Sequence, residues 1–236
     1  MAQGAARQPV TGGLPHGGLF VAGTDTGVGK TLAACALIHA MRRQGLAPVP
    51  FKPVASGCAS TADGLVNDDT ARLIAASGQA LSQDAVSPSR FLPPIAPHLA
   101  AAEAGRPIDL EQLLAQGLAL AQRGPLLVEG AGGWLVPLDA RHTLADLALR
   151  LGLPVVLVVG LRLGCINHAL LSAEAIAARG LPLAGWVGNA IDPGFERLAA
   201  NLDTLRERLP APFLGLIPWL SAPDAREVRL ALPALQ

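Results

Sequence analysis

The sequence has no net charge and no apolar run long enough to cross a membrane. Its 236 residues include 18 Lys and Arg and 18 Asp and Glu, and charged residues make up only 15% of the chain. A balanced chain offers no basic face that would hold a nucleic acid. The apolar stretch VVLVVGL at residues 155–161 is much shorter than the roughly 18–20 residues of a membrane-spanning helix. We therefore expect neither a nucleic acid nor a membrane among the partners.

Cysteine is also scarce, and the first residues lack an apolar segment. The three cysteines are scattered and odd in number, which fits a reduced cytoplasmic protein better than a disulfide framework. No Cys/His cluster has the spacing of a structural zinc site. The N-terminal stretch has no apolar core of the kind found in secretory signals. We expect residues 1–17 to form a flexible tail and residues 18–236 to form a single domain.

Apolar residues, by contrast, make up 51% of the chain, which is enough for a large buried core. Short apolar runs alternate with segments of helical periodicity, and this alternation is typical of βαβ units with a parallel sheet. The predicted strands are residues 19–22, 48–51, 125–128, 154–159, 183–188 and 213–216. The predicted helices are residues 30–44, 68–77, 109–122, 143–150, 166–179 and 195–208. We expect a three-layer α/β fold, with a mostly parallel central sheet and helices on both faces.

The stretch GTDTGVGKT at residues 23–31 predicts a nucleotide-binding loop. It lies between a predicted strand and a predicted helix, as the phosphate-binding pattern G-x-x-x-x-G-K-[ST] requires, although its first Gly comes one residue early. The glycines let backbone N–H groups surround phosphate oxygens at a helix start. Lys30 would reach the terminal phosphates, and Thr31 would offer its hydroxyl to Mg²⁺. The alternative is an ordinary glycine-rich turn, but the intact GKT and its flanks favour a P-loop NTPase-type fold.

Chemically active residues also follow the next predicted strand, at the edge of the sheet where ligands bind in such folds. Lys52 comes directly after residues 48–51, and Ser56 follows closely. Asp68 and Asp69 begin a predicted helix. An acid there either stabilises the helix start or holds Mg²⁺. The spacing does not choose between the two aspartates.

Two further strand ends carry candidate residues. Glu129 ends an apolar strand and is followed by a glycine-rich turn, and a buried carboxylate needs a metal or a polar partner. Glu129 is therefore the stronger metal candidate. Residues 164–167 open a helix without an acidic residue, so their N–H groups are free for an external anion. Cys165 has no base beside it in the sequence, which indicates a packing role and not a nucleophile.

Together these stretches resemble the dethiobiotin synthetase family. The matching segments are GTDTGVGKT, KPVASG, NDD, PHLAA, VEGAGGWLVPL, LGCINHALL, AGWVGN and IPWL, in the family's order from residue 19 to about residue 220. The extra residue in the loop is itself part of the family pattern. The resemblance implies a P-loop ligase domain over residues 18–236. In this family, 7,8-diaminopelargonic acid reacts with CO₂ to form a carbamate, ATP phosphorylates it with Mg²⁺ as cofactor, and the neighbouring amine closes the ureido ring of dethiobiotin, in biotin biosynthesis.

The resemblance also implies roles for individual residues. It makes Lys52 and Lys30 catalytic and gives the Mg²⁺ ligands as Thr31, Asp69 and Glu129. The implied ATP-binding residues are Gly27, Val28, Gly29, Lys30, Thr31, Leu32, Asp69, Glu129, Gly130, Ala131, Gly132, Asn189, Ala190, Ile217, Pro218 and Trp219. The implied substrate-binding residues are Ser56, Gly164, Cys165, Ile166 and Asn167, of which the last four come from the other subunit of a homodimer.

The chain departs from the family pattern at two positions. Arg162 stands where Lys is common, and its planar, bulkier head changes the local geometry. Ala190 stands where an Asp often follows the Asn, which bears on how adenine is selected. The alternative from another class is a P-loop ATPase switch of the partitioning type, which acts by dimerisation and partner binding. Its loop usually has an extra Lys near the start, and residues 24–27 contain none.

Overall fold

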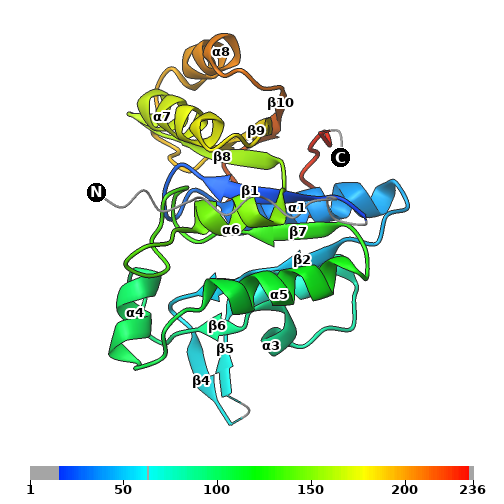
Figure 1. Ribbon diagram of the computed structural model, residues 1–236. Helices are drawn as coiled ribbons and strands as arrows, with labels where there is room; N and C mark the ends of the chain where they lie inside the picture. Colours follow the sequence, from blue (N-terminus) through cyan, green and yellow to red (C-terminus); the bar gives the residue numbers. More distant parts are fainter. Residues whose placement is uncertain (1–15, 63, 234–236) are drawn as a thin grey trace.

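The fold is organised around a six-stranded parallel sheet. A computed structural model describes residues 16–62 and 64–233. The strand order is β10-β9-β8-β1-β7-β2, and every neighbouring pair is parallel (Figure 1). These strands are β1 (Gly18–Gly23), β2 (Val49–Phe51), β7 (Leu126–Glu129), β8 (Val155–Leu161), β9 (Leu183–Ala190) and β10 (Phe213–Ile217). The predicted parallel α/β sheet is confirmed.

Six longer helices connect these strands, and all six are predicted by the sequence. They are α1 (Lys30–Arg43), α2 (Asp68–Ser77), α5 (Leu110–Ala121), α6 (Leu144–Leu151), α7 (Cys165–Ala178) and α8 (Leu198–Arg208). The ends of the predicted elements differ from the observed ones by three residues at most. Among the described residues, no helix is both long and apolar enough to cross a membrane.

Alternating side chains of the central strand β1 point into two separate cores. Phe20 and Ala22 belong to a core shared with α5, α6, α7 and α8. Leu19 and Val21 belong to a second core shared with α1 and α2. Because successive strand residues face opposite sides, one strand buries apolar surface under both layers of helices. The predicted three-layer arrangement is thereby confirmed.

Residues 52–108 contain several short elements that the sequence does not predict. They are β3 (Val54–Ala55), β4 (Ala59–Thr61), β5 (Gly64–Val66), α3 (Gln83–Val86), β6 (Ser89–Arg90) and α4 (Pro97–Glu103). Strands of two or three residues are too short to show periodicity. The helix α4 begins with Pro97 at its first position, where the missing N–H costs nothing. Because other prolines precede it closely, the sequence pattern does not predict a helix that begins here.

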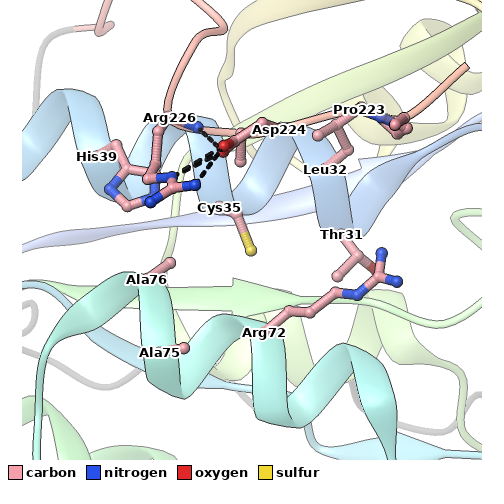
Figure 2. Close-up of a pocket in the computed structure, with 12 residues that line it drawn as sticks. Thr31, Leu32, Cys35, His39, Arg72, Ala75, Ala76, Pro223, Asp224 and Arg226 are labelled. Carbon is pink, nitrogen blue, oxygen red and sulfur yellow. Dashed lines mark hydrogen bonds and ion pairs between the residues drawn. The ribbon is translucent and has the colours of Figure 1, made fainter. Parts of the chain in front are cut away.

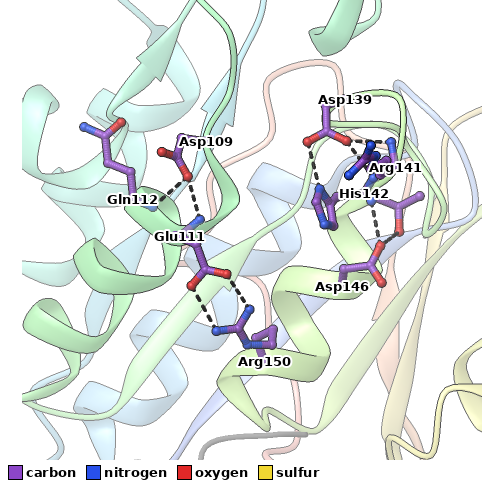
Figure 3. A network of polar contacts seen from close by, with 9 residues as sticks. Asp109, Glu111, Gln112, Asp139, Arg141, His142, Asp146 and Arg150 are labelled. Atoms are coloured by element: carbon purple, nitrogen blue, oxygen red, sulfur yellow. Dashed lines mark hydrogen bonds and ion pairs between the residues drawn. The ribbon is translucent and has the colours of Figure 1, made fainter. Parts of the chain in front are cut away.

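Polar contacts tie α5 to α6 on the outside of the first core. Arg150 donates two parallel hydrogen bonds to Glu111, at 2.9 and 3.0 Å (Figure 3). The start of α6 is closed by a reciprocal cap, in which Thr143 donates its backbone N–H to Asp146 at 2.7 Å. Arg179, just after α7, donates to the same carboxylate at 2.5 Å. These contacts fix three neighbouring helices relative to one another.

The chain after β10 returns over α1, although the sequence predicts no element beyond residue 216. Ala231 donates its backbone N–H to the carbonyl of Leu214 at 2.8 Å. Val228 and Leu230 are buried in the second core, beside α1. This C-terminal segment therefore covers the outer side of α1, close to the nucleotide-binding loop. Residues 1–15 of the predicted tail lie outside the described residues.

Candidate active site

The nucleotide-binding loop connects β1 to α1, and its shape depends on glycine. Gly27 and Gly29 have φ angles of 73° and 86°, a region that favours glycine. A Cβ on Gly29 would lie 2.0 Å from Nδ2 of Asn189. That same nitrogen donates to the carbonyl of Val28 at 2.9 Å. Asn189, at the end of β9, therefore holds the loop from the side and leaves no room for a side chain at position 29.

Asp25 lies inside the loop and makes three contacts. Its carbonyl accepts a hydrogen bond from Nζ of Lys30 at 2.8 Å. Its carboxylate accepts from the backbone N–H of Thr26 at 2.7 Å and pairs with Arg162 at 2.5 Å. The Asp25–Arg162 pair links the loop to the residues just before α7. Arg162, which stands where the family pattern commonly has Lys, therefore contacts the loop directly.

Glu129 is the centre of a buried charged cluster at the carboxyl end of the sheet. Its Oε1 atom accepts hydrogen bonds from the hydroxyl of Thr31 at 2.8 Å and from Nζ of Lys52 at 2.6 Å. Three residues that are far apart in the sequence thus meet at the ends of β7, β2 and the loop. Its other oxygen, Oε2, is buried and has no hydrogen-bond partner among the described residues.

Lys52 is held as a buried cation. Burial alone would lower its pKa, but the carboxylates of Glu129 and Asp69 outweigh burial and raise the pKa above the usual value. The distance from its Nζ to Oδ2 of Asp69 is 3.4 Å. Lys52 is therefore protonated near neutral pH, so it can neutralise an anion but cannot serve as a base there.

Lys30 is the second buried cation, and its charge is held less firmly. Burial lowers its pKa to about 8, and the nearby carboxylate of Glu129 only partly compensates. A phosphate anion in the loop would favour the protonated form, because an opposite charge at short distance stabilises it. The loop is thus electrostatically suited to a triphosphate.

At the start of α2, after β5, Asp68 and Asp69 have different surroundings, although the sequence does not choose between them. Asn67 caps α2, since its side chain accepts the backbone N–H of Thr70 at 3.0 Å. Asp68 is exposed, whereas Asp69 turns toward Lys52. The capping role belongs to Asn67, so it does not account for either aspartate. Of the two, the structure brings Asp69 to the charged cluster.

The residues around Glu129 fit a hard divalent cation. The described part of the chain contains no group of three or more His, Cys, Asp or Glu side chains arranged for a metal. A cation here would therefore need oxygens from phosphate and water besides Thr31, Asp69 and Glu129, and Mg²⁺ commonly binds this way. The unpaired Oε2 of Glu129 supports such a site, because a buried carboxylate oxygen without a partner is costly.

Two other predicted substrate positions differ in what they offer. The hydroxyl of Ser56, just after β3, is buried and has no hydrogen-bond partner in the described residues. At the start of α7, Gly164 has a φ of 93° and the first turn carries no acidic residue. Cys165 is buried, its backbone N–H donates to Arg162 at 3.0 Å, and burial raises the pKa of its thiol. The side chain of Cys165 therefore packs in the core and does not face a ligand.

The predicted nucleotide-binding stretches at the ends of β7, β9 and β10 lie at the same edge of the sheet. Ala190 and Ile217 are buried, whereas Trp219 is 52% exposed. In the glycine turn after β7, the backbone N–H of Gly130 donates to Val21 at 3.0 Å, and Gly132 has a φ of 61°. These residues frame the loop from both sides of β1.

Two features of this site were not predicted from the sequence: the contacts of Asp25 in the loop, and the restriction of lysine to the site. The chain contains only two lysines, Lys30 and Lys52, among its 18 Lys and Arg residues. Both are buried and both lie beside Glu129. Arginine supplies all the other basic side chains, so lysine occurs solely in this cluster. That count is visible in the sequence and points to the site without any motif.

The chain is similar to known proteins along most of its length. A family model described as an AAA domain matches residues 17–226. The ATP-dependent dethiobiotin synthetase of Pseudomonas aeruginosa (strain UCBPP-PA14) is 58% identical over 204 residues, which cover 85% of this chain and 89% of that protein. The protein of the same name from Aromatoleum aromaticum is 51% identical over 214 residues, covering 90% and 95%.

Among solved structures, the cell division protein FtsY of Thermotoga maritima shares the fold. It has a TM-score of 0.50 and 18% identity, and the match covers 97% of this chain and 69% of that chain. The level of identity to the synthetases is far higher and extends over nearly the whole domain. The chain belongs to the ATP-dependent dethiobiotin synthetase family.

Proposed function

We propose that this ligase makes dethiobiotin from 7,8-diaminopelargonic acid, CO₂ and ATP, with Mg²⁺ bound, as a step of biotin biosynthesis. One observation carries the proposal: Nζ of Lys52 donates a hydrogen bond of 2.6 Å to Oε1 of Glu129. The same oxygen accepts a hydrogen bond from the hydroxyl of Thr31. A buried cation, a buried carboxylate and the end of the phosphate loop thus form one cluster. Joining an anionic carbamate to a triphosphate needs such an arrangement of charges.

The first step forms the carbamate. An amine nitrogen of the diamine adds to the carbon of CO₂ and loses a proton, which leaves an anionic carbamate. Lys52, protonated and buried, would hold a carbamate oxygen through its Nζ. The unpartnered hydroxyl of Ser56 would bind the diamine. Both groups belong to the segment that follows β2, so they would position one end of the substrate together.

The second step transfers the terminal phosphoryl group. A carbamate oxygen attacks the γ-phosphorus, and the bond to the bridging oxygen of ADP breaks. Lys30 would lie on the transferring group, where its charge offsets the charge that develops on the phosphoryl oxygens. Bound Mg²⁺ supplies further positive charge to the phosphate oxygens. Thr31, Asp69 and Glu129 would hold that ion.

The third step closes the ring. The neighbouring amine attacks the carbonyl carbon of the carbamoyl phosphate, the carbon–oxygen bond to phosphate breaks, and the nitrogen loses a proton. Inorganic phosphate leaves and the ureido ring is complete. The two lysine charges stabilise the departing phosphate in the same way as the transferring group.

We also propose a homodimer in which the start of α7 binds the distant carboxylate of the partner's diamine. The first turn has no acidic residue, and a helix start attracts anions. Leu163, next to this turn, is 91% exposed, and Leu171 on α7 is 56% exposed. Exposed leucines beside the proposed anion site fit a surface that a second subunit covers. Asn167 is exposed on the same turn.

Mixing two inactive variants tests the shared site. Lys52→Ala removes the cation at one end of the substrate, and Asn167→Asp places a repelling charge at the other end without changing side-chain size. If the site is shared, exchanged dimers regain up to about half of the wild-type activity, because one of their two sites has both parts intact. Confirmed subunit exchange without recovery contradicts the shared site. Asn167→Ser, which adds no charge, is the matched control and should remain active.

Mass spectrometry of the reaction products tests the proposed reaction itself. Purified protein is incubated with the diamine, ATP, Mg²⁺ and ¹³C-bicarbonate. We expect a product that has gained one labelled carbon and one oxygen and has lost two hydrogens, together with one ADP and one phosphate. Release of ADP and phosphate without any labelled product contradicts the proposal and points to an ATPase.

A further inference from the structure

A cavity of about 660 Å³ runs from the nucleotide-binding loop along the groove between α1 and α2. Thr31 and Leu32, the second and third residues after Gly29, line its inner end. Arg72 of α2 lines one side, and the C-terminal segment around Asp224 closes the other (Figure 2). The cavity therefore begins at the residues that contact the phosphates in the proposed reaction and continues away from Lys52.

Arg72 is the one cationic side chain of this cavity that is not already engaged. Asp224 and Arg226 pair with each other at 2.6 Å, so their charges offset one another. Burial, reinforced by Arg42, Arg43 and Arg226 and opposed by Asp224, lowers the pKa of His39 below its usual value, so its ring is mostly neutral at pH 7. Within the described residues, Arg72 has no hydrogen-bond or ion-pair partner, and its guanidinium extends toward Thr31 (Figure 2).

The rest of the cavity is uncharged near the loop. Burial raises the pKa of the Cys35 thiol to about 12, so this side chain stays neutral. Arg72 lies one helical turn after Asp69, and residues three apart on a helix are neighbours on its surface. The same helix thus presents a carboxylate to the charged cluster and, one turn later, an unpaired guanidinium to the cavity.

The direction of a bound nucleotide follows from the proposed function, on which this inference rests. The terminal phosphate must lie toward Lys52, where the carbamate is held. The loop and the first helical residues surround the α- and β-phosphates. The non-transferred end of the phosphate chain therefore leaves the loop past Thr31 and Leu32, into the cavity that Arg72 lines.

We propose that Arg72 binds the α-phosphate of the nucleotide from the α2 side of this cavity. A guanidinium offers several N–H donors in a fixed plane and suits a phosphate with two parallel hydrogen bonds. Such a contact exists before and after phosphoryl transfer, because the α-phosphate takes no part in the reaction. Arg72 is thus a nucleotide-binding residue that sets affinity, and it does not accelerate the chemical step.

This role predicts a specific pattern of kinetic effects. Arg72→Ala should weaken the binding of ATP about tenfold, in the range for losing a hydrogen bond to a charged group. The KM for ATP should rise by a similar factor, while kcat and the KM for the diamine change little. Arg72→Lys keeps the charge but loses the planar fork, so its effect should be smaller.

Calorimetric binding of ATP and ADP to the intact protein tests the assignment. Arg72→Ala should lower the affinity for ATP and for ADP by the same factor, because both carry the α-phosphate. The affinity for GTP should fall by that factor as well. Arg123→Ala is the matched control, since Arg123 is exposed, follows α5 and does not line the cavity. Thermal unfolding of each variant checks that the fold is intact.

Three outcomes would overturn the inference. Unchanged affinity for ATP and ADP in a folded Arg72→Ala variant removes Arg72 from the site. If the variant loses affinity for ATP but not for ADP, the contact is to the terminal phosphate. If the loss of affinity differs between ATP and GTP, the contact is to the nucleoside. Failure of the proposed function is distinguishable from all three, because the wild-type protein would then bind nucleotide without making the labelled product, or would bind none.

Discussion

Nζ of Lys52 and Oε1 of Glu129 lie 2.6 Å apart, and both side chains are almost wholly buried. A buried ion pair needs partners for its remaining polar atoms. Thr31 and Asp69 supply some of them, but Oε2 of Glu129 has no partner among the described residues. The pair therefore lies where a substrate and a cation would complete its contacts.

Replacing Lys52 by Ala should lower kcat by roughly two to three powers of ten, the range for loss of one preorganised charge donor. The carbamate would then face Glu129 without a neutralising cation. Steady-state kinetics with saturating substrates measures the effect, and ATP binding by calorimetry checks that the loop remains intact. A Lys52→Ala variant with near-normal kcat would show that the carbamate is held elsewhere.

Asp69→Asn should raise the Mg²⁺ concentration needed for half-maximal activity by roughly tenfold, as expected for a residue that holds or orients a metal. Its neighbour provides the control, because Asp68 is exposed and makes no contact with Lys52. Asp68→Asn should leave the Mg²⁺ dependence unchanged. If only the Asp68 variant shifts this dependence, the choice between the two aspartates is wrong.

Gly29→Ala should abolish measurable ATP binding, because the new Cβ would collide with Asn189, which anchors the loop at Val28. Gly45→Ala is the control. Gly45 also has a positive φ, of 81°, but a Cβ there meets no atom within 4 Å. That variant should lose about 1 kcal/mol of stability from backbone strain alone and bind ATP normally. Normal ATP binding by Gly29→Ala would mean that the loop and Asn189 can move apart.

Asp146→Asn should lower the free energy of unfolding by about 1 kcal/mol at pH 7, since the Asp146 carboxylate is the third-residue partner of Thr143 in the capping box of α6. Burial alone would raise the pKa of Asp146, but the hydrogen bonds from Thr143 and Arg179 outweigh it and hold the pKa below 3.8. A depressed pKa stabilises the fold above the unfolded value and loses this effect as the pH falls through the folded value. The gap between wild type and variant should therefore begin to narrow as the pH falls below the unfolded value of 3.8 and continue to narrow as the pH falls through the lower folded value.

Urea unfolding between pH 7 and pH 3 measures this gap. Asp203→Asn provides the comparison, because Asp203 forms an exposed pair with Arg206 on α8. Exposed pairs contribute about 0–1 kcal/mol, so this variant should differ little from wild type at either pH. A gap for Asp146→Asn that is unchanged at pH 3 would show that its charge does not stabilise the helix start.

The sequence predicts the sheet well because its six strands are buried on both sides and form clear apolar runs. It also predicts that Lys52, directly after one such strand, and Glu129, at the end of another, lie at the edge where parallel sheets bind ligands, and the structure brings these two side chains together. It does not choose between Asp68 and Asp69, since helix-start chemistry is satisfied by either. In the structure, Asn67 takes the capping role and Asp69 lies 3.4 Å from Lys52, so Asp69 stays the predicted metal ligand.

Other parts of the site depend on tertiary contacts that leave no periodic signal. The role of Asp25 depends on its contact with Arg162, which follows β8 and lies 137 residues away in the chain. Residues 222–233 form no helix or strand, yet residues 222–226 line the cavity beside Arg72, and the burial of Val228 and Leu230 holds this stretch against α1. Irregular segments of this kind are positioned by burial and not by local preference.

Transfer of an oxygen atom from CO₂ to phosphate tests the central claim most directly. The diamine, ATP and Mg²⁺ are mixed with C¹⁸O₂ in ordinary water, and the inorganic phosphate from a single turnover is examined by mass spectrometry. If a carbamate beside Lys52 attacks ATP and phosphate later leaves from the carbonyl carbon, one ¹⁸O atom appears in each phosphate. Phosphate that carries only the oxygens of ATP and water, formed together with dethiobiotin, would contradict a carbamoyl phosphate and the role assigned to Lys52.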